Sequence, residues 1–272
     1  MIQVFRNSTT SGPGHDRPRP TAATLAISAE GGEASVAQRV EILARELQLP
    51  IAGTGKGDDY DLLLVLTPER LELRDNHDPR VGPVLADFSG LDLRPYSRNL
   101  SRRQPLARAF GKKTRTIADA TAGYAQYALL LALMGFQVTA IERNKVVAAL
   151  AQDGLRRLAE KTGLPLEKKL SLLTGDARAL VTKLSPRPDA IYLDPMFPAK
   201  RKKSAAVKKE MRLLRALVGD DPDAVELFEI CRRVALGRVV VKRPDDAPPL
   251  VPDPSMSIAG KLVRYDVYLT HH

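Results

Sequence analysis

The spacing of apolar and polar residues predicts a first block of secondary structure in the N-terminal third of the chain. Residues 36–49 have helical periodicity, and residues 61–66 form an apolar run typical of a buried strand. Residues 71–73 alternate like a returning strand, and residues 84–88 are expected to form a third short strand. These elements predict a small N-terminal α/β domain over residues 21–95.

A second block, in which strand and helix patterns alternate, begins at Thr116. Strands are expected at 116–118, 136–141, 170–173, 190–193, 238–241 and 263–269, and helices at 125–134, 145–161, 177–184 and 223–234. Such alternation favours a mostly parallel sheet with helices on both faces. Right-handed crossovers bring the carboxyl ends of the strands to one edge, where ligands bind. We therefore predict a larger α/β domain over residues 116–272.

The segment between the blocks is strongly basic. Residues 98–115 contain seven Lys and Arg residues and no acidic one, which predicts a basic linker over residues 96–115. The first 20 residues are rich in Ser, Thr, Gly, Pro and Arg, and we expect a mobile tail there. The net charge of +10 favours a polyanionic partner.

Composition also narrows the function classes. One cysteine and four scattered histidines give no pattern for a metal site, so none is expected. No apolar run reaches the ~18 residues that span a bilayer, and the N-terminus lacks a secretory pattern. We therefore expect a cytoplasmic protein without a membrane partner.

Three features fall where the ligand-binding edge of the second block is expected. Residues 119–123, Asp-Ala-Thr-Ala-Gly, join a strand to a helix, and Gly123 lets the backbone approach a ligand closely. Glu142 ends the next strand, 23 positions after Asp119, where a carboxylate accepts both hydroxyls of a ribose. Asp176 follows the third strand, where it can face an adenine amine or cap the next helix. Together they predict an adenosine-type cofactor, without distinguishing S-adenosylmethionine from a dinucleotide.

The most specific motif is Asp194-Pro195-Met196-Phe197-Pro198, which follows the apolar strand at 190–193. It matches the Asp/Asn-Pro-Pro-aromatic loop of methyltransferases that act on planar amines. The lone pair of such an amine is conjugated with its ring, so acceptors on its two N–H bonds favour the reactive pyramidal nitrogen. Asp194 and the carbonyl of Pro195, whose φ is fixed, are the predicted acceptors, and Phe197 offers a face for base stacking. Direct methyl transfer at this loop needs neither a metal nor a covalent enzyme intermediate.

Directly after the loop, residues 200–215 carry eight basic residues against one acid, Glu210. A solvated helix face is the ordinary explanation of such a run, but its position beside the loop favours phosphate contacts. The residues that we expect to contact RNA are Arg102, Arg103, Lys112, Lys113, Lys200, Arg201, Lys202, Lys203, Lys208, Lys209, Arg212, Lys242 and Arg243.

Several of these motifs resemble one known family. The stretches at 119–123, 142–150, 192–198, 202–212 and 239–250, with 66–73 in the N-terminal block, resemble the J-type small-subunit ribosomal RNA guanine-N2 methyltransferases. The resemblance covers roughly residues 60–270 and implies an α/β, Rossmann-like S-adenosylmethionine-dependent methyltransferase with a small N-terminal α/β domain. It also implies that a guanine N2 in 16S rRNA, as free rRNA or in a 30S precursor, is the target.

The resemblance further implies cofactor contacts, which with the turn above make the predicted set Asp119, Gly123, Gln126, Tyr127, Glu142, Arg143, Asp176, Ala177 and Asp194. Two positions depart from the family pattern. A Gly-Leu-Gly-Arg-Asp stretch usual in the family is Gly-Tyr-Ala-Gln-Tyr at 123–127, and serines are usual where Asp176 and Ala177 stand.

Three other functions remain open from the sequence. An adenine-N6 or glutamine methyltransferase uses a similar loop. A nicotinamide-dependent oxidoreductase would use Glu142 but leaves the loop at 194–198 unexplained. A non-enzymatic RNA-binding protein would use the basic segments without binding the cofactor.

Overall fold

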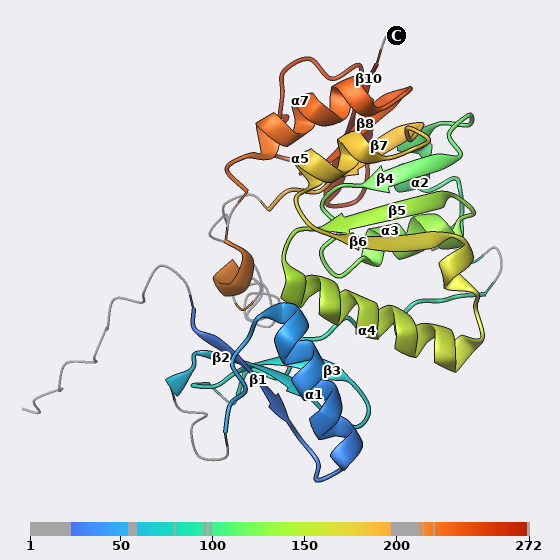
Figure 1. Cartoon of the computed structure of the whole chain (residues 1–272). Coiled ribbons are helices and arrows are strands. Elements are labelled where there is room, and N and C mark those ends of the chain that lie inside the picture. The colour runs from blue at the N-terminus through green and yellow to red at the C-terminus, as the bar shows by residue number, and fades with distance from the viewer. Residues whose placement is uncertain are drawn as a thin grey trace, which may run out of the picture.

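The structure is a computed structural model of the chain (Figure 1), and it describes residues 23–53, 59–78, 80–94, 97, 100–196, 213, 215–219 and 221–270. The expected tail at 1–20 lies outside these residues. Within them, two sheets are present: a three-stranded sheet and a seven-stranded sheet.

The N-terminal domain is built on the smaller sheet, in the order β1-β2-β3. Its elements are β1 (Leu25–Ala29), α1 (Ala34–Leu47), β2 (Leu62–Leu66) and β3 (Leu71–Asp75). The predicted helix and two strands are confirmed, with β3 antiparallel to β2. β1, which the sequence analysis did not identify, pairs parallel with β2.

The predicted strand at 84–88 is wrong. Only Val84 pairs, in an isolated bridge to Leu73, and the chain then leaves the sheet. Contacts with the larger domain compete with strand pairing in this segment, because Ala86 and Phe88 are buried in the core of that domain. The carbonyl of Ala86 accepts a hydrogen bond from Arg157 at 2.7 Å instead of bonding to a strand.

The larger sheet has the order β6-β5-β4-β7-β8-β10-β9. Its strands are β4 (Thr116–Asp119), β5 (Gln137–Glu142), β6 (Leu170–Thr174), β7 (Ala190–Leu193), β8 (Arg238–Pro244), β9 (Met256–Ala259) and β10 (Val263–Leu269). The five strands from β6 to β8 are parallel, as predicted, while β10 pairs antiparallel with β8 and β9. The carboxyl ends of the parallel strands therefore share one edge.

Helices cover both faces of this sheet. Strand residues alternate between the two cores: Ile117 and Tyr192 face α2 (Pro105–Phe110) and α3 (Gln126–Leu133). Ala118 and Ile191 face α5 (Ala177–Leu180) and α7 (Ala224–Val234). The predicted helices at 125–134 and 223–234 are thus confirmed within a residue or two.

The segment expected to be a linker contains α2, which belongs to the larger core. Leu106, Ala107, Ala109 and Phe110 are all buried there, and Phe110 packs on Phe136 and Tyr192. This apolar face was not recognised in the sequence, because basic residues precede and follow α2 and the exposed Arg108 lies within it.

The two domains share the long helix α4 (Lys145–Thr162), which lies between the two sheets in Figure 1. Val146 and Leu150 pack into the N-terminal core, while Ala151 and Leu158 pack into the larger one. The buried carboxylate of Asp153 accepts a hydrogen bond from the backbone N–H of Leu71 in β3 at 3.1 Å. The N-terminal domain is therefore fixed to the larger domain by both apolar and polar contacts.

Candidate active site

Four candidate site residues lie on neighbouring strands, or directly after one, at the carboxyl edge of the larger sheet. Glu142 ends β5, Asp119 ends β4, Asp194 follows β7 and Lys242 belongs to β8, and these strands are adjacent in the order β5-β4-β7-β8. Charges on Asp194 and Glu142 act on Asp119, so the three carboxyl groups form one cluster. The sequence predicted the carboxyl groups at this edge, whereas it placed Lys242 among the RNA contacts.

The turn after β4 donates a hydrogen bond to the carboxylate of Glu142, which ends the neighbouring strand β5. The backbone N–H of Gly123 donates to Glu142 Oε2 at 2.8 Å, and the N–H of Asn144 donates to Oε1 at 2.8 Å. Gly123 has φ +53° and open space where a Cβ would lie. Ala125, where the sequence lacks a second glycine, still adopts φ +61°, which is uncommon for a residue with a side chain. The backbone thus keeps a conformation that favours glycine.

Burial changes the ionisation of two of these carboxyl groups. Asp119 is 1% exposed, and burial raises its pKa to about 8, with the charges of Asp194 and Glu142 acting in the same direction. Burial also raises the pKa of Glu142, against the hydrogen bonds from Asn144 and Gly123. Perturbed carboxyl groups in one cluster are typical of functional sites.

Asp194 is held by its backbone and by its side chain. Its N–H donates to Thr121 Oγ1 at 2.6 Å, which ties the loop after β7 to the turn after β4. Its Oδ2 pairs with Lys242 Nζ at 2.6 Å, and that ammonium lies 4.3 Å from the centre of the Tyr127 ring. Pro195 is the next residue, while Phe197 lies outside the described residues.

Asp221, which sequence reasoning missed, joins the predicted catalytic loop to Arg143. Its Oδ2 accepts a hydrogen bond from the N–H of Met196 at 2.6 Å, and its Oδ1 pairs with the Arg143 guanidinium. Arg143 also pairs with Asp223 at 3.1 Å. The guanidinium expected at the cofactor therefore contacts the segment that leads into α7.

Asp176 caps the N-terminus of α5, which is one of the two roles that the sequence predicted for it. Its side chain accepts from the N–H of Arg178 at 2.9 Å and pairs with the Arg178 guanidinium at 2.7 Å. The hydrogen bond from that guanidinium lowers the pKa of Asp176. The neighbouring Ala177 is buried against α7, and Gln126 is exposed at the start of α3. These contacts account for the cap alone, so the contact of Asp176 with an adenine stays a prediction.

Apart from Lys242, the described residues predicted to contact RNA are not seen at the carboxyl edge. Lys112 and Lys113 are exposed directly before β4 in the chain, so they lie near the amino end of that strand, and Arg102 and Arg103 are exposed as well. Arg102 donates to the carbonyl of Met134 and lies over the Phe136 ring. Arg243 is 6% exposed and donates to the carbonyl of Pro248. The predicted contacts at 200–203, 208, 209 and 212 lie outside the described residues.

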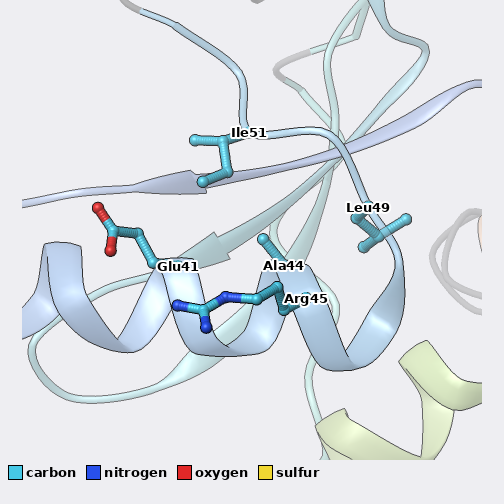
Figure 2. A pocket seen from close by; sticks show the side chains of 5 residues that line it. All are labelled: Glu41, Ala44, Arg45, Leu49 and Ile51. Atoms are coloured by element: carbon cyan, nitrogen blue, oxygen red, sulfur yellow. The ribbon is translucent and has the colours of Figure 1, made fainter.

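Two hollows lie elsewhere on the surface. One, lined by Glu41, Ala44, Arg45, Leu49 and Ile51 on the N-terminal domain, is shown in Figure 2. The other, of about 330 Å³, lies between residues 83–88 and the start of α3, where Tyr124 and Gln126 line it. Gln126, a predicted cofactor contact, therefore faces a hollow beside the Gly123 turn.

Two negative findings apply to the described residues alone. Among them, no three His, Cys, Asp or Glu side chains are arranged so as to hold a metal ion. No helix in this part of the chain is long and apolar enough to cross a membrane.

The fold is that of an S-adenosylmethionine-dependent methyltransferase, and comparisons with known proteins agree. Residues 43–270 match the family described as putative SAM-dependent methyltransferase. A solved SAM-dependent methyltransferase from Neisseria gonorrhoeae is 28% identical and superposes with a TM-score of 0.65, covering 90% of this chain and 96% of its own.

Closer sequence relatives narrow the family. The ribosomal RNA small subunit methyltransferase J of Thioalkalivibrio sulfidiphilus is 45% identical over 90% of this chain and 98% of its own length. The protein of the same name from Serratia proteamaculans is 42% identical over 85% of this chain and 93% of its own length. The chain belongs to the family of these proteins and is a methyltransferase.

The chemistry of the carboxyl edge fits the cofactor of this family. S-adenosylmethionine is positively charged at its sulfonium and ammonium groups, and the carboxyl groups of Glu142 and Asp194, at the ends of neighbouring parts of the sheet, are the groups that can offer it negative charge. The match of residues 43–270 to a methyltransferase family, rather than the charge of this edge, speaks against the oxidoreductase that the sequence left open.

We expect Asp119→Asn to stabilise the protein, and to do so more as pH rises from 5 to 8. The pKa of Asp119 is about 8 in the folded protein, but it returns to about 4 on unfolding. The unfolded chain therefore binds fewer protons across this window, and the free energy of unfolding of the wild type falls as pH rises. An asparagine does not titrate and still accepts the hydrogen bond from the N–H of Thr121.

Thermal melting of both proteins between pH 5 and 9 measures this effect. The difference in Tm should widen up to about pH 8 and then level off. A difference that is the same at every pH would contradict a raised pKa at Asp119.

Proposed function

We propose that this protein transfers a methyl group from S-adenosylmethionine to the N2 of a guanine in 16S rRNA. The observation that carries the proposal is the position of Asp194 and Pro195, directly after β7 at the edge where Asp119 and Glu142 converge. The relatives named as small-subunit ribosomal RNA methyltransferases support the class of substrate.

Each side chain has a distinct part in this reaction. The cofactor supplies an activated methyl group on its sulfonium. Asp194 and the Pro195 carbonyl accept hydrogen bonds from the guanine amine, which draws its lone pair out of conjugation, and Phe197 stacks on the base. Because Thr121 and Asp221 hold the backbone on either side of Pro195, these acceptors are oriented before the substrate arrives.

Glu142 is the proposed ribose acceptor, and its two backbone bonds orient it for this contact. Each oxygen of an ionised carboxylate can accept a second bond, so the N–H groups of Gly123 and Asn144 leave capacity for hydroxyl groups. We expect Glu142→Ala to weaken cofactor binding by about 1–3 kcal/mol, since the hydroxyls and both N–H groups lose their acceptor. Calorimetric titration with S-adenosylmethionine tests this, and wild-type affinity in the variant would refute the ribose contact.

The target is tested directly by mapping methylated nucleotides. Small-subunit rRNA from cells with and without the protein is digested and compared by mass spectrometry, and the purified protein is then given labelled cofactor with each rRNA. A single N2-methylguanine that depends on the protein in both experiments is expected. Methylation of adenine N6 or of a protein glutamine would replace our proposal with that alternative, and RNA binding without transfer would exclude an enzyme acting on rRNA.

Substrate binding is expected to depend on basic residues from two segments of the chain, residues 98–115 and 200–215. Replacing Lys202, Lys203, Lys208 and Lys209 by Gln should flatten the dependence of RNA affinity on salt, because each lost phosphate contact lowers the slope by about 0.7–0.9. Replacing Lys112 and Lys113 by Gln tests the first of these segments. Lys261→Gln, in an exposed turn before β10, is the control. A slope unchanged in both groups would place the RNA elsewhere.

A further inference from the structure

The ion pair between Asp194 and Lys242 places a buried cation on the carboxylate proposed to bind the substrate amine. Lys242 Nζ lies 2.6 Å from Asp194 Oδ2, and the side chains are 17% and 28% exposed. The lysine belongs to β8, next to β7, so a regular strand rather than a mobile loop sets its position. A cation fixed in this way acts on Asp194 whether or not RNA is bound.

The surroundings of Asp194 explain why a cation matters there. The titratable groups that act on this pocket come from every neighbouring element: Asp119 from β4, Glu142 from β5, Tyr127 from α3, Tyr192 from β7, Lys242 from β8 and Tyr265 from β10. Arg143 acts on Glu142 in the same cluster, while Lys242 is the cation that contacts Asp194 among the described residues. Without the charge of Lys242, partial burial would favour the protonated form of Asp194.

Asp119 shows what this pocket does to a carboxyl group that forms no ion pair among the described residues. Its pKa is raised to about 8, chiefly by burial. Burial opposes the charge of Lys242 as well, but Asp194 and Tyr127 outweigh it, and the pKa of the lysine lies above its ordinary value. The Lys242 ammonium therefore stays charged beside Asp194, while Asp119 carries a proton at neutral pH.

This difference matters for chemistry on an amine. A protonated carboxyl group presents an O–H donor to the N–H bonds of the substrate, while an ionised one is purely an acceptor. We propose that Lys242 is a positioning residue that keeps Asp194 ionised and holds its Oδ2, so that Asp194 acts as the acceptor for the substrate amine. The inference rests on the proposed role of Asp194 in the methyl transfer.

The alternative role for Lys242 is the one expected from the sequence, a phosphate contact. The structure favours the counter-ion, because the ammonium is bonded to Asp194 and covered on one side by the Tyr127 ring. The two roles predict different behaviour with pH and with salt.

The test compares Lys242→Met, which keeps the stem and removes the charge, with Lys242→Arg, which keeps a cation. Lys261→Met is the matched control on an exposed turn. Single-turnover methyl transfer is measured from pH 6 to 8.5 at saturating cofactor and RNA. We expect the rate of Lys242→Met relative to wild type to rise at least tenfold over this range, while the ratios for Lys242→Arg and Lys261→Met stay level.

Two results would overturn the proposal. A relative rate of Lys242→Met that is the same at every pH would mean that the charge does not govern the ionisation of Asp194. A wild-type rate at saturating RNA, with weaker RNA binding and a salt slope lowered by about 0.7–0.9, would identify a phosphate contact.

A second measurement does not depend on the substrate. The carboxyl carbon of Asp194, assigned by comparison with Asp194→Asn, is followed by NMR as pH is varied in wild type and in Lys242→Met. We expect it to titrate at least one pH unit higher in the variant. An unchanged titration would refute the role of Lys242, whereas the expected NMR result with no rRNA methylation would refute the proposed function alone.

Discussion

Asp194→Ala should reduce single-turnover methyl transfer by about 100- to 1000-fold while leaving the fold intact. The carboxylate accepts from the amine chiefly as the nitrogen becomes pyramidal, so its removal affects the transition state more than substrate binding. Loss of one such contact costs about 2.7–4 kcal/mol in comparable electrostatic sites. The variant also leaves Lys242 without its carboxylate partner.

The assay uses labelled cofactor and small-subunit RNA, both saturating, with cofactor affinity and Tm measured on the same protein. Asp194→Asn is the informative companion, since its side-chain oxygen can still accept one hydrogen bond, and we expect it to retain more activity than alanine. Near wild-type transfer by Asp194→Ala would show that the loop after β7 is not the catalytic site.

Gly154→Val should destabilise the protein by about 3 kcal/mol, at the upper end of the range for overpacked positions. A Cβ on this residue would lie 2.5 Å from the carbonyl oxygen of Ala86 and 2.7 Å from its Cβ. The oxygen cannot easily move aside, because it accepts the hydrogen bond from Arg157. The clash would therefore force α4 away from the connection between the two domains.

Urea unfolding, followed by circular dichroism, measures the loss. Gly154→Ala is a sharper version of the test: in a helix interior this change alone stabilises by about 1 kcal/mol, so a net loss shows that the contact dominates. Gly32→Ala, where a Cβ would meet no atom within 4 Å, is the control. If the Gly154→Ala protein is as stable as wild type, the backbone at Ala86 can move aside without a loss in the free energy of unfolding.

The sequence predicted most elements of the larger domain because they have a clear apolar period or a turn at their ends, but it missed β9, and the helix expected at 177–184 is α-helical only as far as Leu180. Its three carboxyl groups could be placed together because Asp119 and Glu142 end predicted parallel strands and Asp194 directly follows one. Lys242 follows the predicted strand at 238–241 directly, so the same reasoning would have put it at that edge. Because Lys242 belongs to a basic motif, we predicted that it contacts RNA instead.

Other features depended on contacts between distant parts of the chain. Nothing local to Asp221 indicates that it bonds to Met196 and pairs with Arg143, 78 positions away. The apolar face of α2 was hidden by flanking charges, and the residues at 84–88 leave their sheet because the core of the other domain competes for Ala86 and Phe88. In each of these cases, tertiary contacts rather than the local sequence pattern determine the structure.

Two residues that follow the catalytic loop in the sequence, Leu213 and Leu217, determine whether the N-terminal domain could be replaced independently of the larger domain. Leu213 is buried in the core of the N-terminal domain with Leu217 packed beside it, and the Leu217 carbonyl accepts a hydrogen bond from Asn144 at the start of α4. Leu213 and Leu217, which stand between Met196 and α7 in the sequence, are thus packed on the small domain. That domain is consequently not an accessory that evolution or an engineer could simply exchange for another, since a replacement would also have to rebuild the surface on which Leu213 and Leu217 pack.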